Sequence, residues 1–362
     1  MGKIRVLIVD DSAFMRKMIS SFLEEDHRFE IVAVARNGKD AVEKVKELKP
    51  DVVTLDVEMP ILNGIDALKE IMRVEPVPVV MLSSTTKEGA ENTIIAMQYG
   101  AVDFIAKPSG AISLDIDKVK DEIIQKVYHA SKVKKLNLRF DSQIVKSPIT
   151  NVDNCSKIEK SVTISQGFSL SKKIICIGTS TGGPRALQQV LTRIPRDVDA
   201  PIVVVQHMPP GFTKSLADRL DSISEIHVKE AQDGEVLKRG VAYIAPGGFH
   251  LKVVKVGTSL AVKLDNITVP RNGHRPAVDV LFESVNELLD VAKIAVIMTG
   301  MGSDGTEGLK KLKQSGEVRS IAESEETSVV FGMPKTAIAS NKIDVVARLE
   351  KIAEEIMKMM SK

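Results

Sequence analysis

Residues 3–11 read KIRVLIVDD, an apolar run that ends in two aspartates. A run without alternation, Lys3–Val9, is typical of a strand buried on both faces of a parallel sheet. Further apolar runs follow it, and segments with helical spacing lie between them. The runs are Glu30–Ala35, Val52–Asp56, Val77–Ser83 and Ala101–Ala106, and the helical segments are Ser12–Glu24, Asp40–Lys49, Gly64–Val74, Ala90–Tyr99 and about Asp115–Lys132. This alternation predicts a doubly wound α/β domain.

The alternation resumes at residue 173, and it predicts a second α/β domain over residues 171–362. Its candidate strands are Lys173–Gly178, Ala200–Gln206, Val241–Ala245, Lys293–Thr299, Glu317–Ala322 and Lys342–Val346. Leu251–Leu264 carries Gly-Thr at its middle and predicts an inserted β-hairpin.

Residues 131–170 lack this pattern, and we expect them to form an exposed linker. Ser131–Lys173 holds nine Lys and Arg against three Asp and Glu. The positive charge either keeps the linker soluble or docks it onto an acidic partner; the sequence favours the first.

Composition restricts the class of protein. The chain has 362 residues, enough for two domains, and a net charge of +2 gives no global reason to bind nucleic acid or anionic membrane. Two cysteines, Cys155 and Cys176, exclude a disulfide framework. The N-terminus lacks the features of a signal peptide, and no apolar stretch approaches the ~20 residues that span a bilayer. We expect a cytoplasmic protein without membrane insertion.

Acidic residues end two predicted strands of the first domain. Asp10 and Asp11 follow the first strand, and Asp56 ends the third. Ligand sites in such sheets gather outside the carboxyl ends of the strands, where three carboxylates call for a divalent cation such as Mg²⁺. Ser83 and Lys107, at the ends of the fourth and fifth strands, add a hydroxyl and an ammonium for a phosphoryl group.

The motifs VDDS (9–12), LDVEMP (55–60), MLSS (81–84) and IAKP (105–108) make residues 1–130 resemble the receiver domain of bacterial response regulators. The resemblance implies a flavodoxin-like fold in which Asp56 accepts a phosphoryl group from a histidine kinase. It also implies that Asp10, Asp11 and Asp56 hold Mg²⁺ together with the backbone carbonyl of Glu58.

The resemblance also assigns supporting roles around the phosphosite. Lys107 would contact the phosphoryl group, and Ser83 would move toward it as a switch residue. Phe104 stands where many receivers carry a tyrosine, so a hydroxyl at that position is not part of the signal.

Residues 178–184, GTSTGGP, place Ser180 in a glycine-rich turn between an apolar strand and a helical run. The pattern G-x-S-x-G is typical of a nucleophilic serine at the tip of a sheet. Taken alone, the loop could also cradle a nucleotide phosphate or form a plain turn. A dinucleotide site calls for an acidic residue at the end of the next strand, and that strand ends in Gln206-His207.

Two further strand ends favour the nucleophile. His207 ends the strand after the serine turn, where an imidazole can act as the general base. Asp304 follows the strand 293–299 in another glycine-rich turn, where a carboxylate can orient the imidazole. By itself Asp304 would be a helix cap, but the three strand ends together predict a Ser-His-Asp triad. The other histidines, His274 among them, are mostly left as structural.

The second half resembles the catalytic domain of the chemotaxis-specific protein-glutamate methylesterases, the CheB family. The resemblance is carried by GTSTGG (178–183), QHMPPGFT (206–213), YIAPGG (243–248), HRPAVDVLF (274–282), TGMGSDG (299–305) and VVFGMP (329–334). It implies hydrolysis of glutamyl methyl esters on chemoreceptors, and deamidation of receptor glutamines in many members. Ser180, His207 and Asp304 would be the triad, with the Met301 N–H in the oxyanion hole.

We therefore expect two doubly wound parallel-sheet domains, a receiver and a Rossmann-like esterase domain with an inserted hairpin. The expected protein is a monomeric, phosphorylation-activated methylesterase without a cofactor in the catalytic half. A transcriptional regulator is the first rival, although the second half lacks a basic recognition helix. A non-catalytic adaptor with a vestigial triad is the second.

Overall fold

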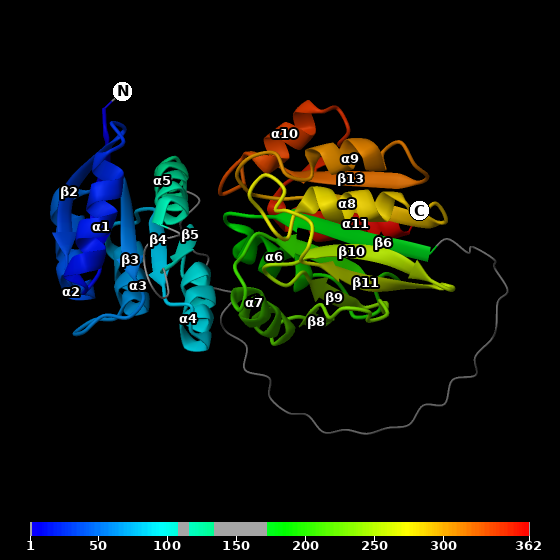
Figure 1. Ribbon diagram of the computed structural model, residues 1–362, viewed down its shortest axis with the longest axis horizontal. Helices are drawn as coiled ribbons and strands as arrows, with labels where there is room; N and C mark the ends of the chain where they lie inside the picture. The colour runs from blue at the N-terminus through cyan, green and yellow to red at the C-terminus, as the bar shows by residue number, and fades with distance from the viewer. Residues whose placement is uncertain (1, 108–115, 134–171, 362) are drawn as a thin grey trace, which may run out of the picture.

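The structure is a computed structural model that describes residues 2–107, 116–133 and 172–361. These residues form two α/β domains that lie side by side, with the N-terminus on one and the C-terminus on the other (Figure 1). Apart from its first three residues, the predicted linker 131–170 lies outside the described residues.

The first domain is a parallel five-stranded sheet in the order β2-β1-β3-β4-β5. This is the flavodoxin-like order, so the predicted fold is confirmed. Its strands are β1 (Ile4–Val9), β2 (Phe29–Ala35), β3 (Val52–Asp56), β4 (Val79–Ser83) and β5 (Asp103–Ala106), and its helices are α1 (Ala13–Glu24), α2 (Gly38–Leu48), α3 (Gly64–Val74), α4 (Lys87–Gln98) and α5 (Ile116–Ser131).

Side-chain caps fix where four of these helices begin. Ser12, Asn37, Asn63 and Thr86 each accept a backbone N–H from the first helical turn. Such caps satisfy N–H groups that have no partner inside the helix. The caps explain why α2 and α4 begin two and three residues earlier than the apolar spacing predicts, since spacing is blind to polar first turns.

The second domain is a parallel seven-stranded sheet in the order β14-β13-β12-β6-β7-β9-β8, with a separate antiparallel hairpin, β10-β11. The predicted parallel sheet and hairpin are both confirmed. The strands are β6 (Lys172–Thr179), β7 (Ile202–Gln206), β8 (His227–Glu230), β9 (Val241–Ile244), β10 (His250–Val256), β11 (Ser259–Asp265), β12 (Val291–Ile297), β13 (Val318–Glu323) and β14 (Val345–Ala347). The helices are α6 (Gly183–Leu191), α7 (Phe212–Asp221), α8 (Val278–Asn286), α9 (Thr306–Leu312), α10 (Met333–Ala339) and α11 (Leu349–Met360).

The sheet order creates a switch point at its centre. On one side of β6 lie β7, β9 and β8, and on its other side lie β12, β13 and β14, so the strand order reverses between β6 and β12. Crevices that bind ligands in open α/β sheets open where the strand order reverses, outside the carboxyl ends. The carboxyl ends of β6, β7 and β12 are therefore the place to look for a site.

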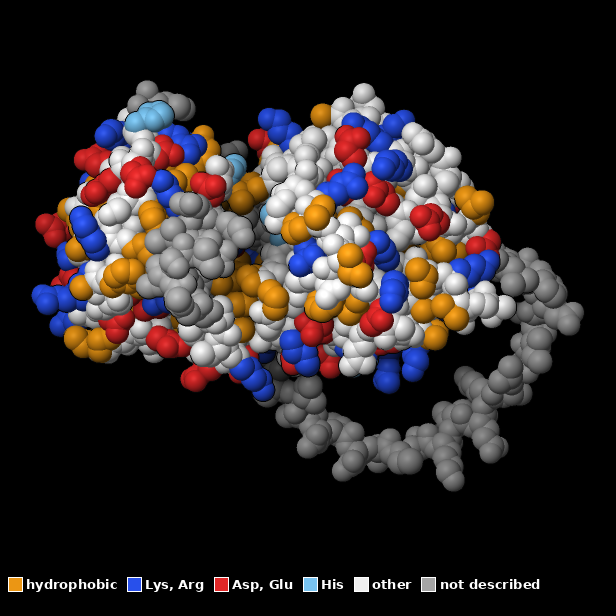
Figure 2. All heavy atoms as spheres, viewed as in Figure 1, with side chains coloured by type: hydrophobic (Ala, Val, Ile, Leu, Met, Phe, Trp, Pro, Cys, Tyr) orange, Lys and Arg blue, Asp and Glu red, His pale blue; other side chains and the backbone are white. Residues whose placement is uncertain are grey.

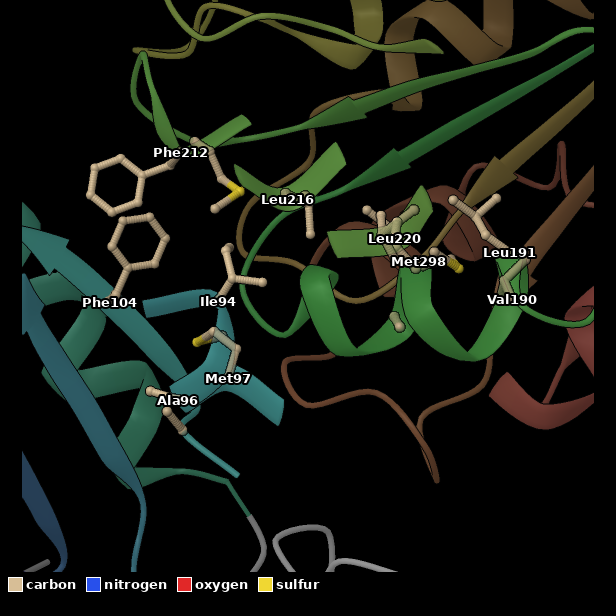
Figure 3. Close-up of a cluster of buried hydrophobic side chains, with 14 of the residues drawn as sticks. Ile94, Ala96, Met97, Phe104, Val190, Leu191, Phe212, Leu216, Leu220 and Met298 are labelled. Carbon is tan, nitrogen blue, oxygen red and sulfur yellow. The ribbon is translucent and has the colours of Figure 1, made fainter. Parts of the chain in front are cut away.

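The two domains share an apolar interface between α4, β5 and α7 (Figure 1). Phe104 of β5 stacks on Phe212 of α7 with ring centroids 4.6 Å apart. Figure 3 shows Ile94 and Met97 of α4 beside this aromatic pair, on the side from which Leu216 of α7 approaches. Because these side chains are buried, each domain covers apolar surface that the other would otherwise expose to water.

No helix in the described part of the chain is long and apolar enough to cross a bilayer.

Candidate functional site

Three of the predicted site residues follow the strands at the switch point. Ser180 comes directly after β6 and His207 directly after β7. The two strands pair in parallel with Thr179 opposite Gln206, so the residues that follow them are register neighbours. Asp304 lies in the turn between β12 and α9, on the far side of β6. The topology thus brings together residues that are up to 124 positions apart.

A short hydrogen bond joins the imidazole to the carboxylate. His207 Nε2 lies 2.7 Å from Asp304 Oδ2, and both side chains are buried. Burial alone would raise the pKa of Asp304, but the hydrogen bond and charge of His207 and two backbone N–H groups hold it below its ordinary value. Those N–H groups belong to Val278 and Asp279, in the first turn of α8. Asp304 is therefore an ionised partner for the imidazole.

The serine turn leaves no room for larger residues. A Cβ on Gly183 would meet Gln206 Oε1 at 1.8 Å, and Gly182 has a positive φ of 79°. The Ser180 N–H donates to the Thr299 carbonyl at 3.0 Å, and the Ser180 carbonyl accepts from the Gln206 amide at 2.9 Å. Its hydroxyl makes no hydrogen bond to any other described residue. The backbone is thus fixed while the hydroxyl stays available.

Met301 lies in the loop after β12, beside the serine. A Cβ on the preceding residue, Gly300, would come within 2.8 Å of Ser180 Cβ. Within the described residues the Met301 N–H has no acceptor. A free N–H so close to the serine turn is the feature an oxyanion hole requires.

The structure adds one residue that the sequence analysis left as structural. The His274 ring stacks on the His207 ring, with centroids 3.9 Å apart and planes at 10°. Burial and the neighbouring His207 lower the pKa of His274 to about 4, so this ring stays neutral at neutral pH. His274 is held by paired backbone hydrogen bonds with Arg271. A neutral ring thus covers one face of the imidazole.

The first domain covers this site. Ser180 is only 7% exposed, and the His207 side chain only 6%. The hydroxyl of Thr181, next to the serine, donates to Asp103 at the start of β5. Lys126 of α5 is near enough to lower the pKa of His274. In Figure 2, hydrophobic side chains gather along the junction between the domains. As it stands, the site is closed to a large substrate.

The predicted acidic cluster forms at the carboxyl edge of the first sheet. Carboxylate oxygens of Asp10, Asp11 and Asp56 lie within 4.8 Å of one another. Lys107 Nζ lies 3.0 Å from Asp10 and 2.8 Å from Asp56. Burial raises the pKa of Asp56 to about 6, although Lys107 opposes the shift. An all-oxygen donor set of this kind fits a hard divalent cation.

The remaining predicted residues surround this cluster. Ser83 is buried, and its hydroxyl donates to the Gly89 carbonyl at 3.0 Å rather than to Asp56. The Glu58 N–H approaches Asp56 Oδ1 at 3.4 Å, which places the Glu58 backbone beside the cluster. Phe104 is buried at the interface, so the position that lacks a hydroxyl contacts the second domain directly.

Known proteins similar to this chain identify both halves. The family described as CheB methylesterase matches residues 175–356, and the response regulator receiver domain matches residues 6–116. A protein-glutamate methylesterase/protein-glutamine glutaminase of Geobacillus kaustophilus is 58% identical over 360 residues, 99% of either chain. The chain belongs to the CheB methylesterase family. It is a methylesterase, an ester hydrolase joined to a receiver domain.

Two further proteins that are similar to this CheB-family enzyme support the same assignment. A protein of Halalkalibacterium halodurans with the same name is 56% identical, covering 99% of this chain and 98% of its own. The crystal structure of the Thermotoga maritima CheB methylesterase catalytic domain is 50% identical, with a TM-score of 0.50, covering 52% of this chain and all of that one.

Proposed function

We propose that this enzyme hydrolyses glutamate methyl esters on chemoreceptors during bacterial chemotaxis adaptation, with a Ser-His-Asp triad and activation by phosphorylation. The observation that carries the proposal is the buried His207–Asp304 pair, 2.7 Å between nitrogen and oxygen, at the strand end next to Ser180. The names of the relatives supply the substrate class, protein glutamate esters, and a second activity, glutamine deamidation.

In the proposed first step, the Ser180 hydroxyl attacks the ester carbonyl and His207 takes its proton. Nε2 of His207 is engaged by Asp304, and Nδ1 is buried without a partner among the described residues. Nδ1 is therefore the nitrogen that accepts the proton. Asp304 fixes the ring and stabilises the imidazolium that forms.

The negative charge that develops on the carbonyl oxygen needs a donor, and the Met301 N–H supplies it. His207 then returns the proton to the leaving methoxy group, and methanol departs. Water hydrolyses the acyl-enzyme by the reverse proton path. With a glutamine side chain the same steps release ammonia. These steps need no cofactor in the catalytic half.

The first domain receives the signal. We propose that Asp56 accepts a phosphoryl group from a histidine kinase, with Asp10, Asp11, Asp56 and the Glu58 carbonyl as the ligands of Mg²⁺. When bound, the ion neutralises charge on the transferring phosphoryl group. Lys107 already contacts Asp10 and Asp56, so it is placed to hold the phosphoryl oxygens.

Regulation follows from the closed interface. Ser83 sits between the phosphosite and α4, because its hydroxyl is bonded to Gly89 in the first turn of that helix. If Ser83 turns toward a phosphoryl group, this bond breaks and the position of α4 shifts. The shift would loosen α4 and Phe104 from α7 and expose Ser180.

We also propose the domain bounds, the oligomeric state and the location of the enzyme. The bounds are a receiver domain over 1–130, a linker over 131–170 and a catalytic domain over 171–362. The proposals also include action as a monomer in the cytoplasm, where receptor signalling helices lie, without binding nucleic acid.

A covalent serine probe separates this proposal from its rivals. A fluorophosphonate should label the phosphorylated enzyme at Ser180, as located by peptide mass mapping. A transcriptional regulator, or an adaptor with a vestigial triad, has no activated serine and would stay unlabelled. Labelling elsewhere in the chain would also contradict the proposal.

A further inference from the structure

A buried carboxyl group outside the triad ends β13, on the same edge of the sheet. Glu323 is 0% exposed. Its Oε2 accepts the Thr299 N–H at 2.8 Å, whereas Oε1 has no hydrogen-bond partner among the described residues. Burial of a carboxyl group with one unpartnered oxygen is costly, and a plain core position would favour an apolar residue.

The residue that Glu323 holds is the anchor of the serine turn. The Thr299 carbonyl accepts the Ser180 N–H at 3.0 Å and the Thr179 hydroxyl at 3.1 Å. The Thr299 hydroxyl donates to the Thr181 carbonyl at 2.9 Å and accepts the Val330 N–H at 3.0 Å. One residue therefore fixes the nucleophile and both of its chain neighbours.

Thr299 also leads directly into the Gly300-Met301 loop. A displacement of Thr299 would move Ser180 and the Met301 N–H relative to each other. Catalysis is sensitive to such displacements, because the oxyanion donor has to meet the tetrahedral oxygen while the serine remains in line.

We propose that Glu323 is a positioning residue of the esterase, which acts through Thr299 to hold the serine turn against the oxyanion loop. This inference rests on the proposed role of Ser180 as nucleophile. Glu323 touches no reacting atom, so its effect should appear in kcat and leave KM unchanged.

The charges around Glu323 give the anchor a pH dependence. Burial raises the pKa of Glu323 to about 7. The Thr299 N–H, the Thr327 hydroxyl that lies near the carboxyl group and the positive charge of Arg185 oppose this rise, and the negative charge of Glu350 adds to it. A cleft of about 650 Å³ lies alongside. Its other charged lining groups are Arg193, Glu326 and Arg348, and Arg348 pairs with Glu326 and Glu350.

The direction in which kcat changes with pH follows from the hydrogen bond between Glu323 and Thr299. An ionised carboxylate accepts the Thr299 N–H more strongly than a neutral carboxyl group does. Below about pH 7 protonation of Glu323 weakens its hydrogen bond to Thr299, so wild-type kcat should fall through an ionisation near pH 7 that depends on Glu323.

The test compares Glu323→Ala and Glu323→Gln in the full chain, after phosphorylation with acetyl phosphate and Mg²⁺. Methanol release from methylated receptor membranes gives kcat and KM between pH 6 and pH 9. Glu323→Ala leaves a buried N–H without an acceptor and should lower kcat about 10- to 100-fold, with KM within about twofold.

Glu323→Gln keeps an acceptor that cannot titrate. Its kcat at pH 8 should stay within about threefold of wild type, and its pH profile should lack the ionisation near pH 7. Glu326→Gln is the matched control: it lines the same cleft, but its side chain is 68% exposed. This control should keep the wild-type kcat and pH profile.

Wild-type kcat in a folded Glu323→Ala would overturn the inference. If Glu323→Ala fails to fold, the Glu323→Gln profile decides, and an unchanged ionisation near pH 7 contradicts the proposal. Ser180→Ala in the same assay distinguishes a failure of the proposed role of Glu323 from a failure of the proposed function. An active Ser180→Ala would refute the proposed function itself, whatever Glu323 does.

Discussion

Removal of the Phe104 ring should open the closed enzyme without phosphorylation. The ring is buried against Phe212, with centroids 4.6 Å apart, and Lys126 lies over it at 5.1 Å. We therefore expect Phe104→Ala to raise the activity of the unphosphorylated protein.

The size of the effect can be worked out from the contact. A stacked aromatic pair contributes about 0.5–1.5 kcal/mol beyond burial, and loss of a fully buried phenyl ring costs about 3–5 kcal/mol. Because Phe104 also packs within its own domain, we assign about 1.5–2.5 kcal/mol of the loss to closure. That shifts the open–closed equilibrium about 10- to 70-fold. The rate stops rising once the protein is fully open, so a basal increase of about tenfold is expected.

The assay is methanol release from methylated receptor membranes without a phosphodonor. Phe14→Ala is a matched control, since Phe14 is on the same domain but is 54% exposed on α1. It should leave the basal rate unchanged. Phosphoryl uptake at Asp56 checks that the Phe104→Ala receiver remains folded. A folded variant with the wild-type basal rate would refute closure by this contact.

Four further predictions concern the triad, the phosphosite, the stacked histidines and the domain interface. Ser180→Ala should lower esterase activity about 10⁴- to 10⁶-fold, and Asp304→Asn should lower it less, because the serine and imidazole remain; steady-state methanol release measures both, and a Ser180→Ala rate within tenfold of wild type contradicts the triad. Asp56→Asn should abolish Mg²⁺-dependent phosphoryl uptake from acetyl phosphate. In the wild type, the raised pKa of Asp56, about 6, means that its carboxyl group binds a proton more tightly in the folded than in the unfolded chain, so the free energy of unfolding should fall as the pH rises from about 4 to 6. Melting curves recorded without Mg²⁺ should show less of this fall in Asp56→Asn. His274→Phe keeps a ring stacked on His207 and should stay within about threefold of wild-type kcat, whereas His274→Ala should lose about tenfold; equal rates would remove any role for the stack. The isolated catalytic domain, residues 171–362, should exceed the basal rate of the unphosphorylated full chain by about tenfold if closure is worth about 1.4 kcal/mol; a domain no faster than the full chain would favour recruitment or direct activation by the phosphorylated receiver.

Strand-end reasoning found the candidate sites because both sheets are parallel. In such a sheet the carboxyl ends of all strands lie at the same edge, so Ser180, His207 and Asp304 could be grouped without any contact information. The same rule grouped Asp10, Asp11 and Asp56. Element boundaries were less certain, since caps such as Asn37 and Thr86 extend helices beyond their apolar spacing.

The strand and site residues that were not predicted from the sequence depend mostly on contacts between distant segments. The strand β8 has the sequence HVKE, which carries no apolar run because it is at the sheet edge. His274 lies in a turn rather than at a strand end, so only the folded chain brings it onto His207. Glu323 did carry a signal, a charged residue that ends an apolar run, and the strand-end rule could have found it.

The interface between the domains had no local signature. Phe104 and Phe212 look like ordinary core residues in their own domains, and their stacking is visible only once both domains are placed. A receiver domain joined to an esterase domain predicts activation by phosphorylation. The residues that carry it could not be named from the sequence.

Phosphorylation-activated ester hydrolysis at Ser180 is tested by methanol release from methylated receptor membranes by the full chain, with and without acetyl phosphate and Mg²⁺. We predict a slow basal release, an increase with the phosphodonor, and no release above background from Ser180→Ala under either condition. Release that does not depend on Ser180, or no release with the phosphodonor present, would contradict this prediction.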